Sequence, residues 1–223
     1  EDLKKIRRLI THGCSFTYGE ELADPSVSSW PALVAKKLDV ELVNLARPAW
    51  SNDAILQDLV AQDINSIPNG EAPSWNHYMD LVVVCWTSHL RMQLMDDEGD
   101  YTVLANSKER GHRKQVSDLL SATNNQLWLY ERWLTQVILA QHYLDGLHAK
   151  WLFFSAFDNQ IIDVISDLHA KIDKTRFLGW PNKGFVEWAY PCKLGPRGHP
   201  LEDGHQRVAD RVLQGIKDRY DIA

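Results

Sequence analysis

The sequence has little cysteine, no long apolar run and no excess of positive charge, and each absence excludes a class of protein. Three cysteines in 223 residues, none in a Cys-x-x-Cys pair, exclude a disulfide framework and a zinc ribbon. The longest apolar runs, near residues 81–86 and 137–140, are far shorter than the ~18 residues of a membrane-spanning helix. A formal net charge of −6 argues against a nucleic-acid-binding protein, which usually carries a basic face.

Aromatic residues, by contrast, are plentiful enough for a full hydrophobic core. Nine tryptophans, seven tyrosines and six phenylalanines bury large areas, and a chain of this length needs no disulfide or metal to fold. We therefore expect a single domain over residues 1–223. No N-terminal apolar segment typical of a signal peptide is visible, and we expect a cytoplasmic or otherwise soluble protein.

Short apolar strands alternate with amphipathic helices along the chain. Residues 80–86 (DLVVVCW) form a continuous, largely β-branched apolar run, which predicts a parallel strand buried on both faces. Further strands are predicted at residues 8–11, 40–45 and 150–155, and helices at 30–38, 55–64, 127–147, 161–172 and from about Leu201 onward. This order predicts an α/β protein: a three-layer α/β/α sandwich with a mostly parallel central sheet in a flavodoxin-like order.

Two segments interrupt this alternation. Residues 96–114 are polar and charged, and we expect them to form a surface excursion or a lid. Residues 179–198 are rich in glycine, proline and tryptophan and are predicted to form a loop before the last helix.

Polar motifs stand at the predicted ends of three strands and before the last helix. They are GCSFT at residues 13–17, NLARPAWSN at 44–52, WTSH at 86–89 and GHP at 198–200. In an open α/β sheet, ligands bind at the carboxyl ends of the strands, so these four segments are expected to meet there.

In their order and spacing, GCSFT, NLARPAWSN, VVVCWTS and GHPLEDGHQRVA resemble the four sequence blocks of the SGNH (GDSL-type) hydrolase superfamily. The resemblance covers nearly the whole chain. It implies a three-layer α/β/α fold and hydrolysis of esters, thioesters or glycan O-acetyl groups through an acyl-enzyme. By the same resemblance, Ser15 matches the nucleophile and His199 the base that takes the proton from its hydroxyl group. From the residues alone, Ser15 is equally a turn serine, and His199 a residue that caps the last helix.

The resemblance also assigns the groups that hold the oxyanion. They are the backbone N–H of Ser15, an N–H at Ala49, where the family has glycine, and a side chain at Ser88, where the family has asparagine. A hydroxyl group is a shorter and less fixed donor than an amide. Asn52 is a second candidate for the missing amide, and it is equally a candidate N-cap of the helix that follows.

The acid that orients the histidine is missing from its usual place. The family often has an aspartate three residues before the histidine, and Pro196 stands there. We expect a Ser–His dyad in which a backbone carbonyl orients the imidazole. Glu202 and Asp203 are the alternative acids, although their place at the start of a helix suits the helix dipole.

We expect the substrate to be a small-molecule or glycan ester, contacted by Trp50, Trp86 and Arg91 near the site. No cofactor and no metal is expected, because His199 and His205 are six residues apart and do not share a helix face. Two alternatives remain open: a weak or inactive binding module on the same fold, and an acyltransferase that uses the same acyl-enzyme. The sequence does not specify the oligomeric state.

Overall fold

The computed structural model describes residues 6–64, 79–96, 99–104, 111–123, 126–158 and 166–220. The central sheet has four parallel strands in the order β2-β1-β3-β6. These strands are β1 (Arg8–His12), β2 (Glu41–Asn44), β3 (Asp80–Trp86) and β6 (Lys150–Ser155). The expected α/β sandwich with a parallel central sheet is confirmed.

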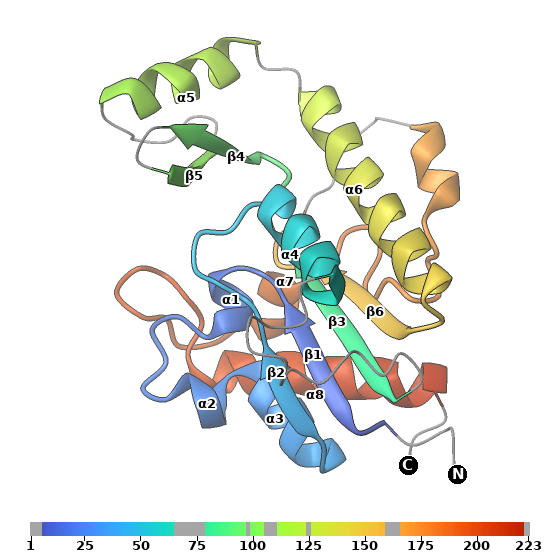
Figure 1. The fold of residues 1–223 in the computed structure, drawn as a ribbon. Coiled ribbons are helices and arrows are strands. Elements are labelled where there is room, and N and C mark those ends of the chain that lie inside the picture. Colours follow the sequence, from blue (N-terminus) through green and yellow to red (C-terminus); the bar gives the residue numbers. More distant parts are fainter. Residues whose placement is uncertain are drawn as a thin grey trace.

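Helices cover both faces of this sheet, as Figure 1 shows. One face carries α3 (Trp30–Leu38) and α8 (Glu202–Tyr220), and the other carries α4 (Asn52–Ile64) and α6 (Gln126–Gly146). The remaining helices are α1 (Ser15–Tyr18), α2 (Pro25–Ser28), α5 (Gly111–Thr123), the 3₁₀ helix η1 (Asp167–Lys171) and α7 (Phe185–Ala189).

Strand β3 shows why an uninterrupted apolar run is needed at the centre of the sheet. All seven of its residues are buried. Leu81, Val83 and Cys85 pack into the core on the α3–α8 side. Val82, Val84 and Trp86 pack into the core on the α4–α6 side. Because helices cover both faces of the sheet, β3 has no face exposed to solvent. Its side chains therefore do not alternate between apolar and polar along the strand.

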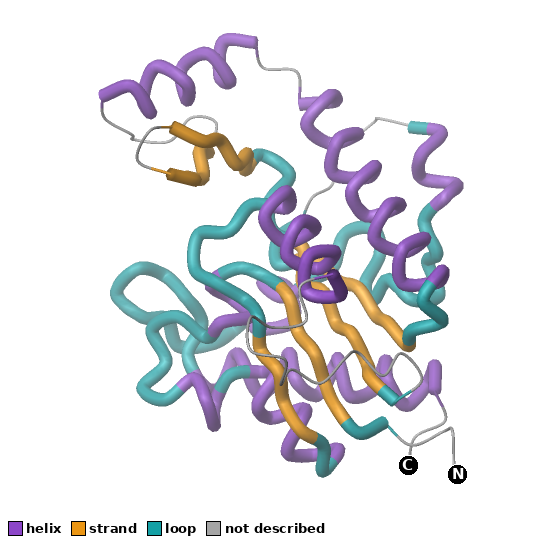
Figure 2. Tube along the Cα trace, in the orientation of Figure 1, coloured by secondary structure: helices purple, strands orange, loops and turns teal. Residues whose placement is uncertain are grey.

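A two-stranded antiparallel ribbon lies apart from the central sheet, at the top of Figures 1 and 2. It consists of β4 (Arg91–Asp96) and β5 (Gly99–Leu104). The expected irregular excursion at residues 96–114 therefore contains β5 and the start of α5, while residues 97–98 and 105–110 lie outside the described part.

Two local predictions of secondary structure need correction. Within the segment expected as one helix at 161–172, the structure has a 3₁₀ helix over Asp167–Lys171, and residues 161–165 lie outside the described part. The expected loop at 179–198 contains the short helix α7, which begins after Gly184. A five-residue helix stabilised by tertiary packing of Phe185 and Ala189 leaves too short a periodic pattern to detect.

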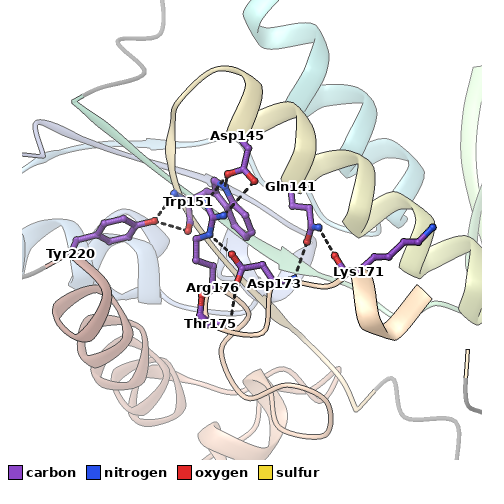
Figure 3. Close-up of polar contacts among 8 residues, drawn as sticks. All are labelled: Gln141, Asp145, Trp151, Lys171, Asp173, Thr175, Arg176 and Tyr220. Atoms are coloured by element: carbon purple, nitrogen blue, oxygen red, sulfur yellow. Dashed lines mark hydrogen bonds and ion pairs between the residues drawn. The ribbon is translucent and has the colours of Figure 1, made fainter. Parts of the chain in front are cut away.

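The amino-terminal end of β6 is fixed by a polar cluster around Arg176, shown in Figure 3. Its guanidinium donates to Asp145 at 2.6 and 3.3 Å and to Asp173 at 2.6 Å, and lies 3.9 Å from the ring centre of Trp151. Tyr220 donates its hydroxyl proton to the carbonyl of Trp151 and accepts the N–H of the same residue, both at 2.8 Å. The cluster joins the ends of α6 and α8 to β6, at the end of the sheet opposite the motifs.

Candidate active site

Ser15 lies in a tight turn directly after β1. It is the first residue of α1 and is only 3% exposed. The turn needs a glycine at residue 13, because a Cβ atom there would come within 2.3 Å of the Thr17 hydroxyl and 3.1 Å of the Cys85 carbonyl oxygen. The serine is thereby held at the carboxyl end of a central strand, between β2 and β3.

His199 reaches Ser15 from a turn just before α8. Nε2 of His199 lies 3.0 Å from Oγ of Ser15, which agrees with the ~3 Å expected for a nucleophile and its base. The N–H of Gly195 donates to the carbonyl of His199 at 2.8 Å, and the N–H of Gly198 donates to the carbonyl of Gly195 at 2.9 Å. This closed turn aims the imidazole at the serine.

Glu21 approaches the other nitrogen of the imidazole. Its Oε2 atom lies 2.9 Å from Nδ1 of His199 and accepts the backbone N–H of the same residue at 3.1 Å. Its Oε1 atom accepts the backbone N–H of Arg197 at 2.8 Å. Desolvation raises the pKa of Glu21, but these hydrogen bonds outweigh it and hold the pKa below its ordinary value. An ionised Glu21 places the ring proton on Nδ1 and leaves Nε2 free to accept the serine proton.

The structure therefore corrects the expected source of the orienting group. Neither a backbone carbonyl nor Glu202 or Asp203 contacts Nδ1 in the part of the chain that the structure describes. Asp203 instead accepts the backbone N–H of Lys193 at 3.2 and 3.3 Å, and Glu202 is exposed in the first turn of α8. Both carboxylates are where the positive end of the helix dipole favours them, so the helix accounts for their position.

Sequence reasoning missed Glu21 because its approach depends on backbone geometry. Gly19 ends α1 in the left-handed region, with φ 88°, and Glu21 itself has φ 72°. A Cβ atom at Gly195 would lie 2.7 Å from Cδ of Glu21, so the turn before His199 leaves room for this carboxylate. The available signal was the pair of carboxylates five and six residues after Ser15, on a loop at the same end of the sheet.

Ala49, the residue that stands in the glycine position of the second block, has φ 63°. This left-handed conformation costs an alanine ~1–2 kcal/mol, whereas glycine adopts it freely. The backbone at Ala49 thus has a conformation that glycine favours, and the alanine holds it under strain.

The side-chain amide of Asn52 is hydrogen-bonded to backbone groups. Its Nδ2 atom donates to the carbonyls of Thr87 and Ser88, at 3.1 and 3.3 Å, and its Oδ1 atom accepts the N–H of Thr87 at 2.8 Å. Asn52 is 1% exposed and joins the second block to the third. The N-cap of α4 is Ser51, whose Oγ accepts the N–H of Ala54 at 3.3 Å.

Ser88, in contrast, keeps a proton that it can donate. Its Oγ atom accepts the N–H of Leu90 at 3.2 Å, and a hydroxyl group that accepts one hydrogen bond can still donate another. Ser88 therefore stays a candidate side-chain donor to the oxyanion, whereas the side-chain amide of Asn52 is taken up by bonds to the third block.

Of the three expected substrate contacts, two lie together and one is in the core. Trp86 is 0% exposed and packs edge-to-face on Phe153, 5.5 Å between ring centres, which corrects its expected place at the surface of the site. Arg91 donates to the backbone carbonyl of Trp50 at 3.2 Å, and its guanidinium lies 6.0 Å from the ring centre of Phe157. Trp50 and Arg91 remain candidates for substrate binding.

A cavity of about 410 Å³ opens beside the second block. It is lined by Tyr18, Asn44, Leu45, Ala46, Arg47, Pro48 and Asp58. Because the N–H of Arg47 donates to the carbonyl of Gly13 at 3.2 Å, the cavity wall is fixed to the turn that carries Ser15. Among the described residues, no group of three His, Cys, Asp or Glu side chains is placed to hold a metal ion, and no helix has the length and apolarity to span a membrane.

A buried serine, a histidine and a carboxylate thus lie in series at the end of a parallel sheet, a geometry in which the histidine can take the proton of the serine hydroxyl group. Solved structures of esterases share this fold, at 12–13% sequence identity. The esterase EstA from Pseudoalteromonas sp. superposes with a TM-score of 0.56 at 12% identity, over 96% of this chain and 99% of its own.

Two longer carbohydrate esterases share the fold. An acetyl xylan esterase (Est2A) from Butyrivibrio proteoclasticus has a TM-score of 0.54 at 13% identity, over 98% of this chain and 66% of its own. A carbohydrate esterase family 2 enzyme with a carbohydrate-binding domain, from Corynascus thermopiles (Myceliophthora fergusii), has a TM-score of 0.57 at 12% identity, over 95% and 66%. The chain thus spans about two thirds of these two proteins. No protein-family model and no curated protein matches the sequence.

Proposed function

We propose that the protein is a serine esterase that cleaves carboxylic esters through an acyl-enzyme. The observation that carries this proposal is the continuous series from Ser15 Oγ through the His199 imidazole to the Glu21 carboxylate, with steps of 3.0 and 2.9 Å. In this series the proton of Ser15 passes to Nε2 as the serine oxygen attacks the ester carbonyl, and Glu21 stabilises the imidazolium that forms.

The second half of the reaction uses the same groups. The imidazolium returns its proton from Nε2 to the departing alcohol as the tetrahedral intermediate collapses to the acyl-enzyme. Water then attacks the acyl group while Nε2 takes a proton from it, and the imidazolium returns that proton to Ser15 Oγ as the acid product leaves. The backbone N–H groups of Ser15 and Ala49 and the hydroxyl of Ser88 are the proposed donors to the oxyanion in both steps.

The substrate class is inferred from the surroundings of the site. The cavity that the Arg47–Gly13 hydrogen bond joins to the Ser15 turn is lined by polar groups and one aromatic ring, that of Tyr18, and such a lining suits a small acyl ester or an O-acetylated glycan. Two proteins with the same fold support this substrate class: one is described as an acetyl xylan esterase and the other as a carbohydrate esterase.

Reaction with a fluorophosphonate, followed by mapping of the modified residue, tests the proposal. We expect a single adduct on Ser15, and loss of both the adduct and chromogenic acetate hydrolysis in Ser15→Ala. Ser26→Ala, which changes an exposed serine on α2, is the matched control and should keep both. A folded wild-type protein that is neither labelled nor active is a binding module instead, whereas a product that requires an added alcohol acceptor identifies an acyltransferase.

A further inference from the structure

Glu20, the residue beside the proposed acid, faces the opposite nitrogen of the same histidine. Its Oε2 atom lies 3.6 Å from Nε2 of His199, while Glu21 contacts Nδ1. Adjacent residues therefore place a carboxylate at each end of the imidazole. Of the two, only Glu21 is within hydrogen-bond distance, so Glu20 has no part in orienting the ring.

The carboxylate of Glu20 is held in place from its far side. Oε1 accepts from Nη2 of Arg197 at 2.8 Å, and its backbone N–H donates to the carbonyl of Ser15 at 3.0 Å. Only 17% of its side-chain surface is exposed. In the part of the chain that the structure describes, no N–H or O–H group donates a hydrogen bond to Oε2. A carboxylate oxygen that is only partly in contact with water is stabilised by a ligand that donates a hydrogen bond to it.

The position of this free acceptor determines which part of a substrate meets it. In the proposed reaction, Nε2 delivers its proton to the oxygen of the departing alcohol, which must come within hydrogen-bond distance of Nε2. Glu20 Oε2 borders the same space. A hydroxyl group on the carbon adjacent to the one that carries the ester oxygen lies about one hydrogen-bond length (~2.8 Å) further on, within reach of Oε2.

We propose that Glu20 accepts a hydrogen bond from a hydroxyl group of the leaving alcohol, and that the site thereby selects esters of polyhydroxylated alcohols, such as sugars or glycerol, over alkyl esters. The inference rests on the proposed esterase function and specifies its alcohol side. An alkyl alcohol excludes water from Oε2 but offers it no donor, and leaving a polar atom of the site without a hydrogen bond is an effective means of rejection. Glu20 is thus a specificity-determining residue, distinct from the acid Glu21.

Glycerol monoacetate and propyl acetate form a matched pair of substrates that tests this proposal. They share the acyl group and the three-carbon alcohol skeleton and differ only in hydroxyl groups, and acetate release measures both. We expect the wild-type kcat/KM to be higher for the glycerol ester. In Glu20→Ala the ratio of the two values should fall about 10- to 100-fold, the range for loss of a hydrogen bond to a charged group. Glu20→Gln, which keeps the shape and an acceptor, should fall by a smaller factor.

The control variant is Glu202→Gln, an exposed carboxylate at the start of α8, which should leave the ratio unchanged. A wild-type ratio near one, or an equal loss for both esters in Glu20→Ala and Glu20→Gln, overturns the inference while hydrolysis dependent on Ser15 leaves the proposed function standing. A wild-type protein that releases acetate from neither ester overturns the inference. If that protein also fails to react with the fluorophosphonate, the proposed function falls with it.

Discussion

The carboxylate of Glu21 lies 2.9 Å from Nδ1 of His199, although 178 positions separate the two residues in the chain. The same carboxylate accepts two backbone N–H groups of the turn that carries the histidine, those of Arg197 and His199. Glu21 therefore positions the turn as well as the ring. Its loss should affect the reaction more than the stability of the fold.

The first prediction concerns this acid. Glu21→Gln keeps the size of the side chain but removes the charge that stabilises the imidazolium, and we expect kcat on an acetate ester to fall by ~10³–10⁴. Glu202→Gln and Asp203→Asn should each stay within about tenfold of the parent, a change of ~1.4 kcal/mol in barrier. A large loss in either of those two, with Glu21→Gln active, would show that the acid has been misassigned.

The second prediction concerns Ser88 as an oxyanion donor. Removing one preorganised donor costs ~10²–10³ in rate, so Ser88→Ala should lower kcat by up to this factor. Ser88→Asn restores an amide and should hold or raise the rate if the site has room. Steady-state kinetics on a chromogenic acetate, with thermal melting to verify the fold, distinguish these cases. Equal rates in the parent and both variants would remove Ser88 from the oxyanion hole.

The third prediction concerns the side-chain amide of Asn52, which joins the second sequence block to the third. Asn52→Ala leaves the buried N–H and carbonyl of Thr87 without their partners, and we expect a loss of about 2–4 kcal/mol in the free energy of unfolding. Asn182→Ala, at an exposed asparagine, is the control and should stay within ~0.5 kcal/mol. Urea denaturation measures both. A loss no larger than that of the control would mean that Asn52 does not hold the third block.

The fourth prediction concerns the strained backbone at Ala49. Ala49→Gly releases the ~1–2 kcal/mol of left-handed strain, but the greater chain entropy of the unfolded state offsets ~0.4–1 kcal/mol of this, so the net gain should be between about 0 and about 1.6 kcal/mol. Ala170→Gly in the 3₁₀ helix has no strain to release and should lose ~0.5–1 kcal/mol. Thermal melting of the two variants gives opposite signs if Ala49 is strained as described.

The fifth prediction concerns pH-dependent stability from His205. Burial, with a smaller contribution from His199, lowers the pKa of this histidine from 6.5 to about 4, and its Nδ1 atom accepts the N–H of Trp30 at 3.1 Å. Above pH 6.5 the His205 side chain is neutral in both the folded and the unfolded chain. As the pH falls toward 4, the unfolded chain takes up a proton that the folded chain does not, and stability falls by roughly 3 kcal/mol.

Urea denaturation between pH 7 and pH 4 measures this contribution. His205→Gln, which removes the titrating group, should show a shallower decline over this interval than the wild type. The test compares slopes, so an overall loss of stability in the variant does not affect it. Identical slopes in the two proteins would contradict the role of His205.

The sequence by itself determined the layers and the ends of the strands where the site lies. A β-branched run such as residues 80–86 has one stable place, at the centre of a sheet covered on both faces, and parallel strands bring their carboxyl ends to one edge. Ser15 and His199 could be placed at that edge for this reason. Their distance of 3.0 Å agrees with what the motifs predicted.

Only the tertiary structure decided which polar groups serve the histidine and which hold the backbone. The approach of Glu21 depends on a left-handed backbone at residues 19 and 21 and on the missing side chain at Gly195, and none of these leaves a periodic signal. From the sequence, the amide of Asn52 was a candidate oxyanion donor and the ring of Trp86 a candidate substrate contact. In the structure, the amide is hydrogen-bonded to Thr87 and the ring is buried in the core. Periodicity reports which face of an element is buried, whereas these assignments depend on contacts between residues far apart in the chain.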